Sequence, residues 1–426
     1  MTRLNLALTG DSMITMRHSV HNEPSFVRLV RLLRRADFAF TNLETAIHDY
    51  DGWPSPEPGG TFMRSPPFVV DELQWLGVKA VSTANNHSLD YMYGGLRRTI
   101  QHMSSRGLVS AGTGMDLGQA RCPAYVDTGA GRVGLIAAAS TFAPFGRAGP
   151  SSADLRGRPG LNPLRFETIC TAERASFDAI AKLAEYVGWP SSREPGAEIL
   201  VPGGTSFRLG RSAMVTTLAN TADVSGNLDS VREAARQADC VLFSLHAHEG
   251  QPNDARRPAN FVEDFARKCI DAGAHIFVGH GPHVLRGIEI RKGRPIFYSL
   301  GNFIYQNMTV SRAPAEFYES LDLDQATSTP ADAFDARQAK HPAFGGPTGN
   351  DYWRSVVAKV SFEAGRVRAI ALYPIELGAS SPRSQRGRPK LAGRDEAQAI
   401  LTQLQRCSAP YGTRIIIRNG IGTITV

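Results

Sequence analysis

The feature that most constrains this chain is a series of strand-like segments, each ending at a polar side chain that can bind a metal ion. In chain order these are Asp11 after residues 4–9, Glu44 after 38–41, Asn86 and His87 after 78–83, His246 after 240–245, and His280 and His283 after 275–278. In open α/β sheets, the carboxyl ends of strands meet at the crevice where ligands bind. We therefore expect these side chains to converge on one site, although they are far apart in the sequence.

Each of these motifs alone has an ordinary structural explanation. Asp11 suits a turn, Glu44 suits a helix cap, and a single histidine after a strand is more often a hydrogen-bonded polar residue than a ligand. The metal interpretation rests on repetition, because five strands that all end in metal-capable residues are not expected by chance.

Helix-like segments separate the strands, and this alternation predicts a layered α/β fold. The expected helices span residues 26–35, 67–76, 94–106, 228–238 and 260–272, and one more buried strand is expected at 132–139.

Two segments interrupt the alternation. Residues 141–225 are rich in Gly and Pro and contain one expected helix at 168–186, and residues 307–350 are rich in Ala, Asp, Thr and Pro. We interpret both as insertions that cover or shape a cleft, and expect them to line it. The expected organisation is a catalytic core at 1–306 with an insertion at about 141–225, an insertion at 307–350, and a β-rich completion of the core at 351–426 with a helix at 394–405.

Composition excludes several classes of protein. Of the 426 residues, 42% are hydrophobic and 20% charged, which is ordinary globular usage, and the net charge of +7 is too scattered to predict nucleic-acid binding. No stretch approaches the roughly 20 apolar residues of a membrane helix, so no membrane association is expected. The five cysteines show no CxxC spacing and the first ten residues read as a strand, so we predict a cytoplasmic protein with reduced thiols.

Several sequence blocks closely resemble the bacterial capsule-synthesis CapA-type proteins of the calcineurin-like metallophosphoesterase superfamily. The blocks are Gly10-Asp11-Ser12-Met13, Asn42-Leu43-Glu44-Thr45, Asn85-Asn86-His87-Ser88-Leu89-Asp90-Tyr91, Gly279-His280-Gly281-Pro282-His283 and Ser299-Leu300-Gly301-Asn302-Phe303. The resemblance spans residues 4 to about 305. It implies an α/β calcineurin-like fold of layered mixed sheets flanked by helices.

The resemblance also implies which residues form the site. The metal ligands would be Asp11, Glu44, Asn86, His246, His280 and His283. Carboxylate, amide and imidazole ligands suit a divalent ion such as Ca²⁺, Mn²⁺, Mg²⁺ or Zn²⁺. His87 would be the active-site acid or base, and Asp90, three residues on, would hold its ring in one tautomer.

The chain departs from the superfamily pattern in ways that bear on function. Ser12 and Met13 stand where phosphoesterases carry Asp-x-His, and Glu44 replaces the usual bridging Asp, so a dinuclear phosphatase centre is not the expected one. Met92 stands where the CapA-type branch usually has Gly, and Arg286 where Gln is common. Because an added guanidinium suggests an anionic group to bind, we expect Arg286 to contact substrate. The 157–165 block adds two expected substrate contacts, Asn162 and Arg165.

CapA-like proteins without a membrane anchor also include the peptide epimerases of lasso-peptide biosynthesis, and this chain looks like one of them. We therefore expect a metal-dependent isomerase that acts on a peptide and inverts its C-terminal residue. Inversion needs two opposed bases, for which the expected pairs are His87 with Asp90 and His283 with Asp11. A metallohydrolase of phosphoesters or amides, a capsule polyglutamate synthesis protein and a non-catalytic assembly protein remain alternatives. Assembly into a homo-oligomer is also left open.

Overall fold

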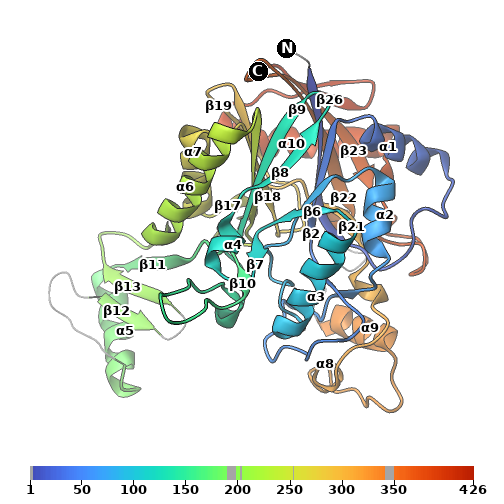
Figure 1. The fold of residues 1–426 in the computed structure, drawn as a ribbon. Coiled ribbons are helices and arrows are strands. Elements are labelled where there is room, and N and C mark those ends of the chain that lie inside the picture. The colour runs from blue at the N-terminus through green and yellow to red at the C-terminus, as the bar shows by residue number, and fades with distance from the viewer. Residues whose placement is uncertain (1–2, 190–197, 202–203, 253, 341–349) are drawn as a thin grey trace.

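Two mixed β-sheets packed face to face form the centre of the protein (Figure 1). The structure is a computed structural model that describes residues 3–189, 198–201, 204–252, 254–340 and 350–426. The first sheet runs in the order β25 (Ile416–Arg418), β26 (Ile421–Ile424), β23 (Arg366–Glu376), β22 (Arg354–Glu363), β1 (Leu4–Met13), β2 (Phe38–Leu43), β5 (Ala80–Ser82) and β6 (Val109–Ala111), with β21 (Asn302–Tyr305) paired to β1 and β24 (Lys390–Leu391) to β23. The second runs β19 (Ile288–Arg291), β20 (Arg294–Phe297), β18 (Ile276–His280), β15 (Cys240–His246), β9 (Gly131–Ala139) and β8 (Ala124–Thr128).

The strand β15 shows why these sequences form a two-sided sheet. All its residues are buried, and successive side chains point to opposite faces. Leu242 joins the core between the two sheets, whereas Val241 and Phe243 pack toward the helices on the outer face. His246 is an even number of residues from Leu242, so it points to the inner side, toward the other sheet.

Helices cover both outer faces. Beside the first sheet lie α1 (Pro24–Arg34), α2 (Val69–Leu76) and α3 (Met92–Ser105), and beside the second lie α6 (Thr221–Gln237) and α7 (Asn260–Ala272) (Figure 1). The helix α10 (Arg394–Ser408) contributes Ile400, Leu401 and Leu404 to the core between the sheets. The expected α/β fold of layered mixed sheets flanked by helices is thereby confirmed.

The segment 141–225 contains a small sheet of its own. Its order is β12 (Glu198–Val201), β13 (Thr205–Leu209), β11 (Phe166–Ala172) and β14 (Met214–Ala219). The helix α5 (Arg174–Tyr186) packs on it through a separate apolar cluster that includes Phe177 and Ile199. This unit projects at the lower left of Figure 1.

Three sequence-based helix boundaries were wrong in instructive ways. Residues 168–172 belong to strand β11 because their β-branched side chains pair on both sides with β13 and β14. Helix α6 begins seven residues before the expected start at 228, because the Asn220 side chain accepts a hydrogen bond from Asp223 N and caps it there. Helix α10 continues to Ser408 rather than ending at residue 405.

The remaining elements are short. They are β3 (Ala46–Ile47), β4 (Arg64–Ser65), β7 (Thr113–Gly114), α4 (Leu117–Arg121), β10 (Gly160–Leu161), β16 (Gly250–Gln251), β17 (Asp254–Pro258), α8 (Ala315–Glu319) and α9 (Pro330–Lys340), with 3-10 turns at Pro144–Gly146, Asn307–Thr309, Asn350–Trp353 and Ala409–Tyr411. Within the described part of the chain, no helix is both long enough and apolar enough to cross a membrane.

A β-bulge in β1 orients its functional carboxylate. Leu8 pairs with Phe40 and Asp11 pairs with Asn42, so β1 advances three residues where β2 advances two. An extra residue reverses the face on which the following side chains lie. Asp11 therefore points to the inner side with Leu8, whereas a regular strand would turn it toward the outer helices.

Gly10 makes this bulge possible, and its replacement should destabilise the protein. A Cβ atom on Gly10 would lie 1.7 Å from the carbonyl oxygen of Gly301, so either β1 or the 301 turn must move. We expect Gly10→Ala to cost about 1–3 kcal/mol or more, measured by chemical denaturation. The control is Gly129→Ala, because nothing lies within 4 Å of a Cβ atom there. Equal stability of the two variants would contradict this account of the bulge.

Candidate metal centre

The strand ends that carry the expected ligands do meet. Asp11 lies in the bulged end of β1, and Glu44 directly follows β2. His246 and His280 are the last residues of β15 and β18, and they are register partners in the parallel pair. His283 lies in the turn after β18. The first sheet thus supplies the carboxylates and the second sheet supplies imidazoles to the same space.

Asp11 is fully buried and surrounded by donors and histidines. Its Oδ1 accepts a hydrogen bond from Asn42 Nδ2 at 2.8 Å and lies 3.6 Å from His280 Nδ1. Its Oδ2 accepts from the backbone of Gly281 at 3.1 Å and lies 3.4 Å from His283 Nδ1. Burial alone would raise the pKa of Asp11, but the hydrogen bond to His283 and the neighbouring imidazoles hold that pKa well below its usual value. Asp11 is therefore ionised at neutral pH.

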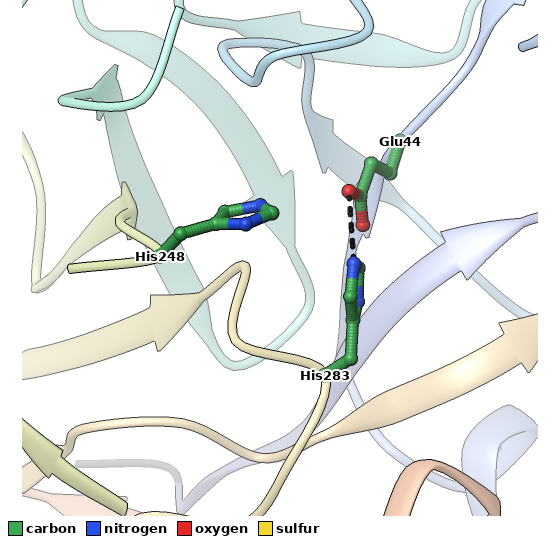
Figure 2. A group of neighbouring side chains, drawn as sticks. All are labelled: Glu44, His248 and His283. Carbon is green, nitrogen blue, oxygen red and sulfur yellow. Dashed lines mark ion pairs between the residues drawn. The ribbon is translucent and has the colours of Figure 1, made fainter. Parts of the chain in front are cut away.

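Glu44 is the second buried carboxylate, and it has no hydrogen-bond partner among the described residues. Its Oε1 lies 3.7 Å from both His246 Nε2 and His283 Nε2, and 3.9 Å from His87 Nε2. Figure 2 shows Glu44 and His283 facing each other, with the His248 ring turned toward the same space. Burial, followed by the negative charges of Asp11 and Asp90, raises the pKa of Glu44 well above its usual value. A cation between the groups would reverse this shift.

The unsatisfied atoms form a ligand set that fits a divalent cation. Both oxygens of Glu44, Oδ1 of Asn86 and both ring nitrogens of His280 are buried without a hydrogen-bond partner in the described structure. Unpaired buried polar groups cost roughly 1–3 kcal/mol each, so a cluster of them calls for an occupant. Their ligand atoms are oxygens and imidazole nitrogens, which suit Mn²⁺, Zn²⁺, Mg²⁺ or Ca²⁺.

Two groups of side chains are close enough to share an ion, and Glu44 belongs to both. One consists of Asp11, Glu44 and His246, and the other of Glu44, His248 and His283, with ligand atoms within 4.8 Å of one another in each. Burial lowers the pKa of His280 to about 4 and that of His248 to about 3, so these two imidazoles are neutral, as metal ligands must be.

His248 was missed at the sequence level. It follows His246 by two residues, and its Nε2 lies 3.1 Å from His246 Nε2. The His-x-His spacing beyond a strand end was the available signal. Because His248 lies two residues beyond the end of β15, the strand-end pattern that predicts the other ligands does not include it.

His87 and Asp90 form the pair that the sequence spacing predicted. Their Nδ1 and Oδ2 atoms are 2.6 Å apart and both side chains are buried. Asp90 also accepts hydrogen bonds from the backbone N–H groups of Gly59 and Met63. This fixes the carboxylate, so Asp90 can hold the His87 ring with Nε2 directed toward Glu44.

His283 has a comparable arrangement on the other sheet. Its Nδ1 lies 2.9 Å from Asn302 Oδ1, in addition to the contact with Asp11. Its backbone has φ +58°, a left-handed conformation that costs a non-glycine residue about 1–3 kcal/mol. Such strain at a histidine that faces two buried carboxylates is typical of functional positions.

Three expected substrate contacts are placed elsewhere. Arg286 is 1% exposed, and it donates to the backbone carbonyls of Ala255, Ala247 and His248 at 3.0, 3.3 and 3.0 Å. Arg286 does not line the cleft, so the structure gives no support to the expectation that it clamps an anion. Three of its five N–H donors bind backbone carbonyls, and Arg286 thereby supports the loop that carries His248.

Asn162 and Arg165 are also structural. Asn162 is fully buried, donates to Ala137 O and Asn227 Oδ1, and accepts from Arg121. Arg165 forms a bidentate ion pair with Asp223 on α6. Neither lines the cleft at the metal cluster, so the 157–165 block joins the small sheet to the core instead of contacting substrate there.

The cleft over the cluster, about 340 Å³, is lined mostly by other residues. Besides Asn86, His87, His248 and His283, the lining includes Met13, Gly59, Gly60, Thr61, Ala255, Pro282, Tyr305, Asn307, Arg337 and Tyr352. Asn307 and Arg337 come from the 307–350 segment, so its described part does reach the cleft as expected.

Met92 begins helix α3 directly after the His87 loop, and its φ is +51°. This conformation is easy for glycine and strained for methionine, which agrees with the glycine that the CapA-type resemblance leads us to expect at this position.

The fold and site together define a metallophosphoesterase-like α/β protein. The chain belongs to the family described as "Bacterial capsule synthesis protein PGA_cap", whose model matches residues 5–307. That range contains every expected metal ligand as well as His87, Asp90 and His248.

Individual relatives agree with this assignment. Two proteins of Sinorhizobium fredii, described only as uncharacterized, are each 39% identical over 429 residues, covering 98% of this chain and 92% of theirs. The PGA biosynthesis protein CapA of Bacillus subtilis is 44% identical over 89 residues, or 20% of this chain and 22% of that protein. A probable polyglutamine synthesis accessory protein of Mycobacterium tuberculosis is 29% identical over 271 residues, or 63% of this chain and 55% of that protein. CapA-type membership, predicted from the motifs, is confirmed.

Glu44→Gln should separate metal binding from fold stability. In wild type, adding Mn²⁺ to EDTA-treated protein should raise Tm, because an ion that binds only the folded state stabilises it. The variant should lose this rise and most of its bound metal by elemental analysis, yet melt at or above wild type in EDTA, because it lacks the buried carboxylate. His102→Ala on α3 is the control. A full Mn²⁺ response in Glu44→Gln would remove the site from this position.

Proposed function

We propose that this protein is a metal-dependent enzyme that performs acid–base chemistry on a peptide-type substrate. The observation that carries the proposal is a pair of histidines, His87 and His283, on different elements but lining the same cleft. Each has its Nδ1 beside a side-chain oxygen and its Nε2 within 4 Å of the same Glu44 oxygen. Two positioned imidazoles facing one space are what a two-base reaction requires.

Asp11, Glu44 and His246, with Asn86 and His280, would hold a divalent cation. When bound, the cation supplies Lewis acidity that stabilises negative charge on a substrate carbonyl or phosphoryl oxygen.

Epimerisation at a peptide α-carbon is the reaction that this arrangement favours. One imidazole removes the α-proton at Nε2, and the other delivers a proton to the opposite face, so the bond broken and the bond formed are both C–H bonds. Asp90 keeps His87 in one tautomer, and Asp11 with Asn302 does the same for His283. The family resemblance suggests the C-terminal residue of a ribosomal peptide, such as a lasso-peptide precursor, as the substrate.

A second candidate is a role in making an amide-linked capsule polymer, and the comparisons favour it over epimerisation. The names of the curated relatives refer to PGA biosynthesis and to polyglutamine synthesis. In this case the same site would hydrolyse or trim an amide bond, with His87 protonating the leaving nitrogen. Both candidates act on a peptide-like chain, and neither calls for nucleic acid. A cytoplasmic location is part of the epimerase proposal.

Deuterium incorporation separates the two candidates. We expect the Mn²⁺-loaded protein, incubated in D₂O with short peptides bearing a free C-terminal carboxylate, to insert one deuterium without fragmenting them. Mass spectrometry and chiral amino-acid analysis give the readout. A γ-linked oligoglutamate is the parallel substrate, and its cleavage without deuterium at Cα would favour the polymer candidate. Absence of both products would contradict an enzymatic role on peptides.

Single-base variants test the two-histidine arrangement. We expect His87→Ala and His283→Ala each to reduce epimerisation about 10²–10⁴-fold, because a general base typically contributes that much. One variant should still exchange the α-proton of the L-peptide and the other that of the D-peptide, since each retains one base. The control is His102→Ala, which should behave as wild type. Loss of both exchanges in both variants would contradict a two-base reaction.

A further inference from the structure

A second cavity adjoins the metal cleft. It has a volume of about 440 Å³, is bounded by the loop at 55–62 and by α8, and shares Gly60 and Arg337 with the metal cleft. Its lining includes the largely buried side chains of Phe62, Phe317 and Leu321, together with Glu316. We call the two adjoining spaces the groove, with the metal cluster at one end and these apolar side chains at the other.

Arg337 stands at the junction. It projects from α9, and its Nη2 lies 3.8 Å from the point where a Cβ on Gly60 would be. Gly60 has φ +109°, a conformation that glycine tolerates best, so the loop presents bare backbone to the guanidinium. Burial lowers the pKa of Arg337, with Tyr305 and Tyr352 acting in the opposite direction. An arginine remains charged under such conditions.

The metal cleft lies over the buried carboxylates of Asp11 and Glu44, and its lining carries an arginine. Among the described residues that line it, Arg337 is the only Lys, Arg, Asp or Glu, and the other polar groups are histidines, tyrosines, a threonine and amides. A small adjoining cavity beside Tyr305 is lined by Arg383 and Arg386 as well as Arg337, and among its described lining residues Asp335, paired with Arg383, is the only carboxylate. Arg337 therefore places a positive charge at the junction that can bind an anionic substrate group, while Glu316 lines the second cavity.

We propose that Arg337 binds the carboxylate of a peptide substrate and that the cavity beside Phe62 and Phe317 takes an apolar side chain of the adjoining residue. This inference rests on the proposed function and names its substrate class as a peptide with a free carboxylate next to an apolar residue. A guanidinium can hold a carboxylate through two parallel hydrogen bonds, which fixes its orientation as well as its charge. Arg337, His87 and His283 line the same cleft, so a substrate held there would lie in the space that the two imidazoles share.

Binding of three probes to the full chain tests the inference by calorimetry, independently of chemistry. The probes are N-acetyl-Phe-Ala, its C-terminal amide, and N-acetyl-Gly-Ala. In wild type we expect the amide and the glycine probe each to bind about tenfold more weakly than the first, as a charged hydrogen bond or a buried phenyl ring predicts. Because a bound cation also attracts carboxylates, each titration is run with Mn²⁺ and with EDTA.

The variant Arg337→Gln should abolish the preference for carboxylate over amide but keep the preference for phenylalanine over glycine. Arg312→Gln, an exposed arginine that lines neither space, is the matched control and should retain both. Melting curves verify that each variant is folded, and the wild-type probe series remains informative if Arg337→Gln is not. Carboxylate preference that persists in folded Arg337→Gln, or no measurable binding of any probe, would overturn the proposal.

The test also distinguishes this inference from the proposed function. If probe binding depends on Arg337 but no deuterium is exchanged, the proposed binding role of Arg337 stands and epimerisation is rejected. If deuterium exchange is unchanged in Arg337→Gln, epimerisation stands and the binding role of Arg337 is rejected.

Discussion

The structure depends on two carboxylates, Asp11 and Glu44, buried together where the two sheets meet. Like charges in a low-dielectric interior cannot both ionise without compensation, and here their pKa values are pushed in opposite directions. Asp11 is compensated by backbone and side-chain donors, whereas Glu44 has no hydrogen-bond partner among the described residues. Asp11 is thus satisfied by groups of the protein itself, whereas Glu44 is placed as a ligand for a cation would be. Isolated surface charges would need no such asymmetry, because water would solvate both.

The sandwich explains how residues far apart in sequence reach this point. Each sheet delivers side chains at the carboxyl ends of parallel strands, and the pairing of His246 with His280 places two imidazoles side by side. In the other sheet the bulge in β1 turns Asp11 inward. Arg286 then holds the loop after β15 through three backbone carbonyls, which positions His248. The geometry of the site therefore depends on strand register, on the bulge in β1, and on the buried Arg286 side chain, which binds backbone carbonyls.

Sequence reasoning succeeded where local pattern and position coincide, as at strand ends and at the three-residue spacing of His87 and Asp90. It failed where the destination of a side chain depends on tertiary packing. Arg286 and Arg165 are charged residues near functional motifs, but their partners lie 31–58 residues away in the chain, so nothing local shows that their donors are already occupied. The position of Arg337 in the cleft depends on how α9 folds back over the core, which no periodicity in that segment reveals.

The residues that line the metal cleft lie partly inside and partly outside the family match, and this bears on what the family name implies for this chain. The family match at residues 5–307 includes the carboxylates and imidazoles of the metal cluster. Two residues that line the same cleft, Arg337 and Tyr352, lie beyond it. The candidate metal ligands and the two candidate bases therefore lie in the shared part, whereas the cleft's only Lys, Arg, Asp or Glu among its described lining residues belongs to the part outside the match. The Bacillus subtilis and Mycobacterium tuberculosis relatives align with 20% and 63% of this chain. They therefore inform the part inside the family match and say little about the part outside it. If the residues inside the match form a common reaction centre and the residues outside it line the substrate cleft, members of one family could act on different amide-linked chains.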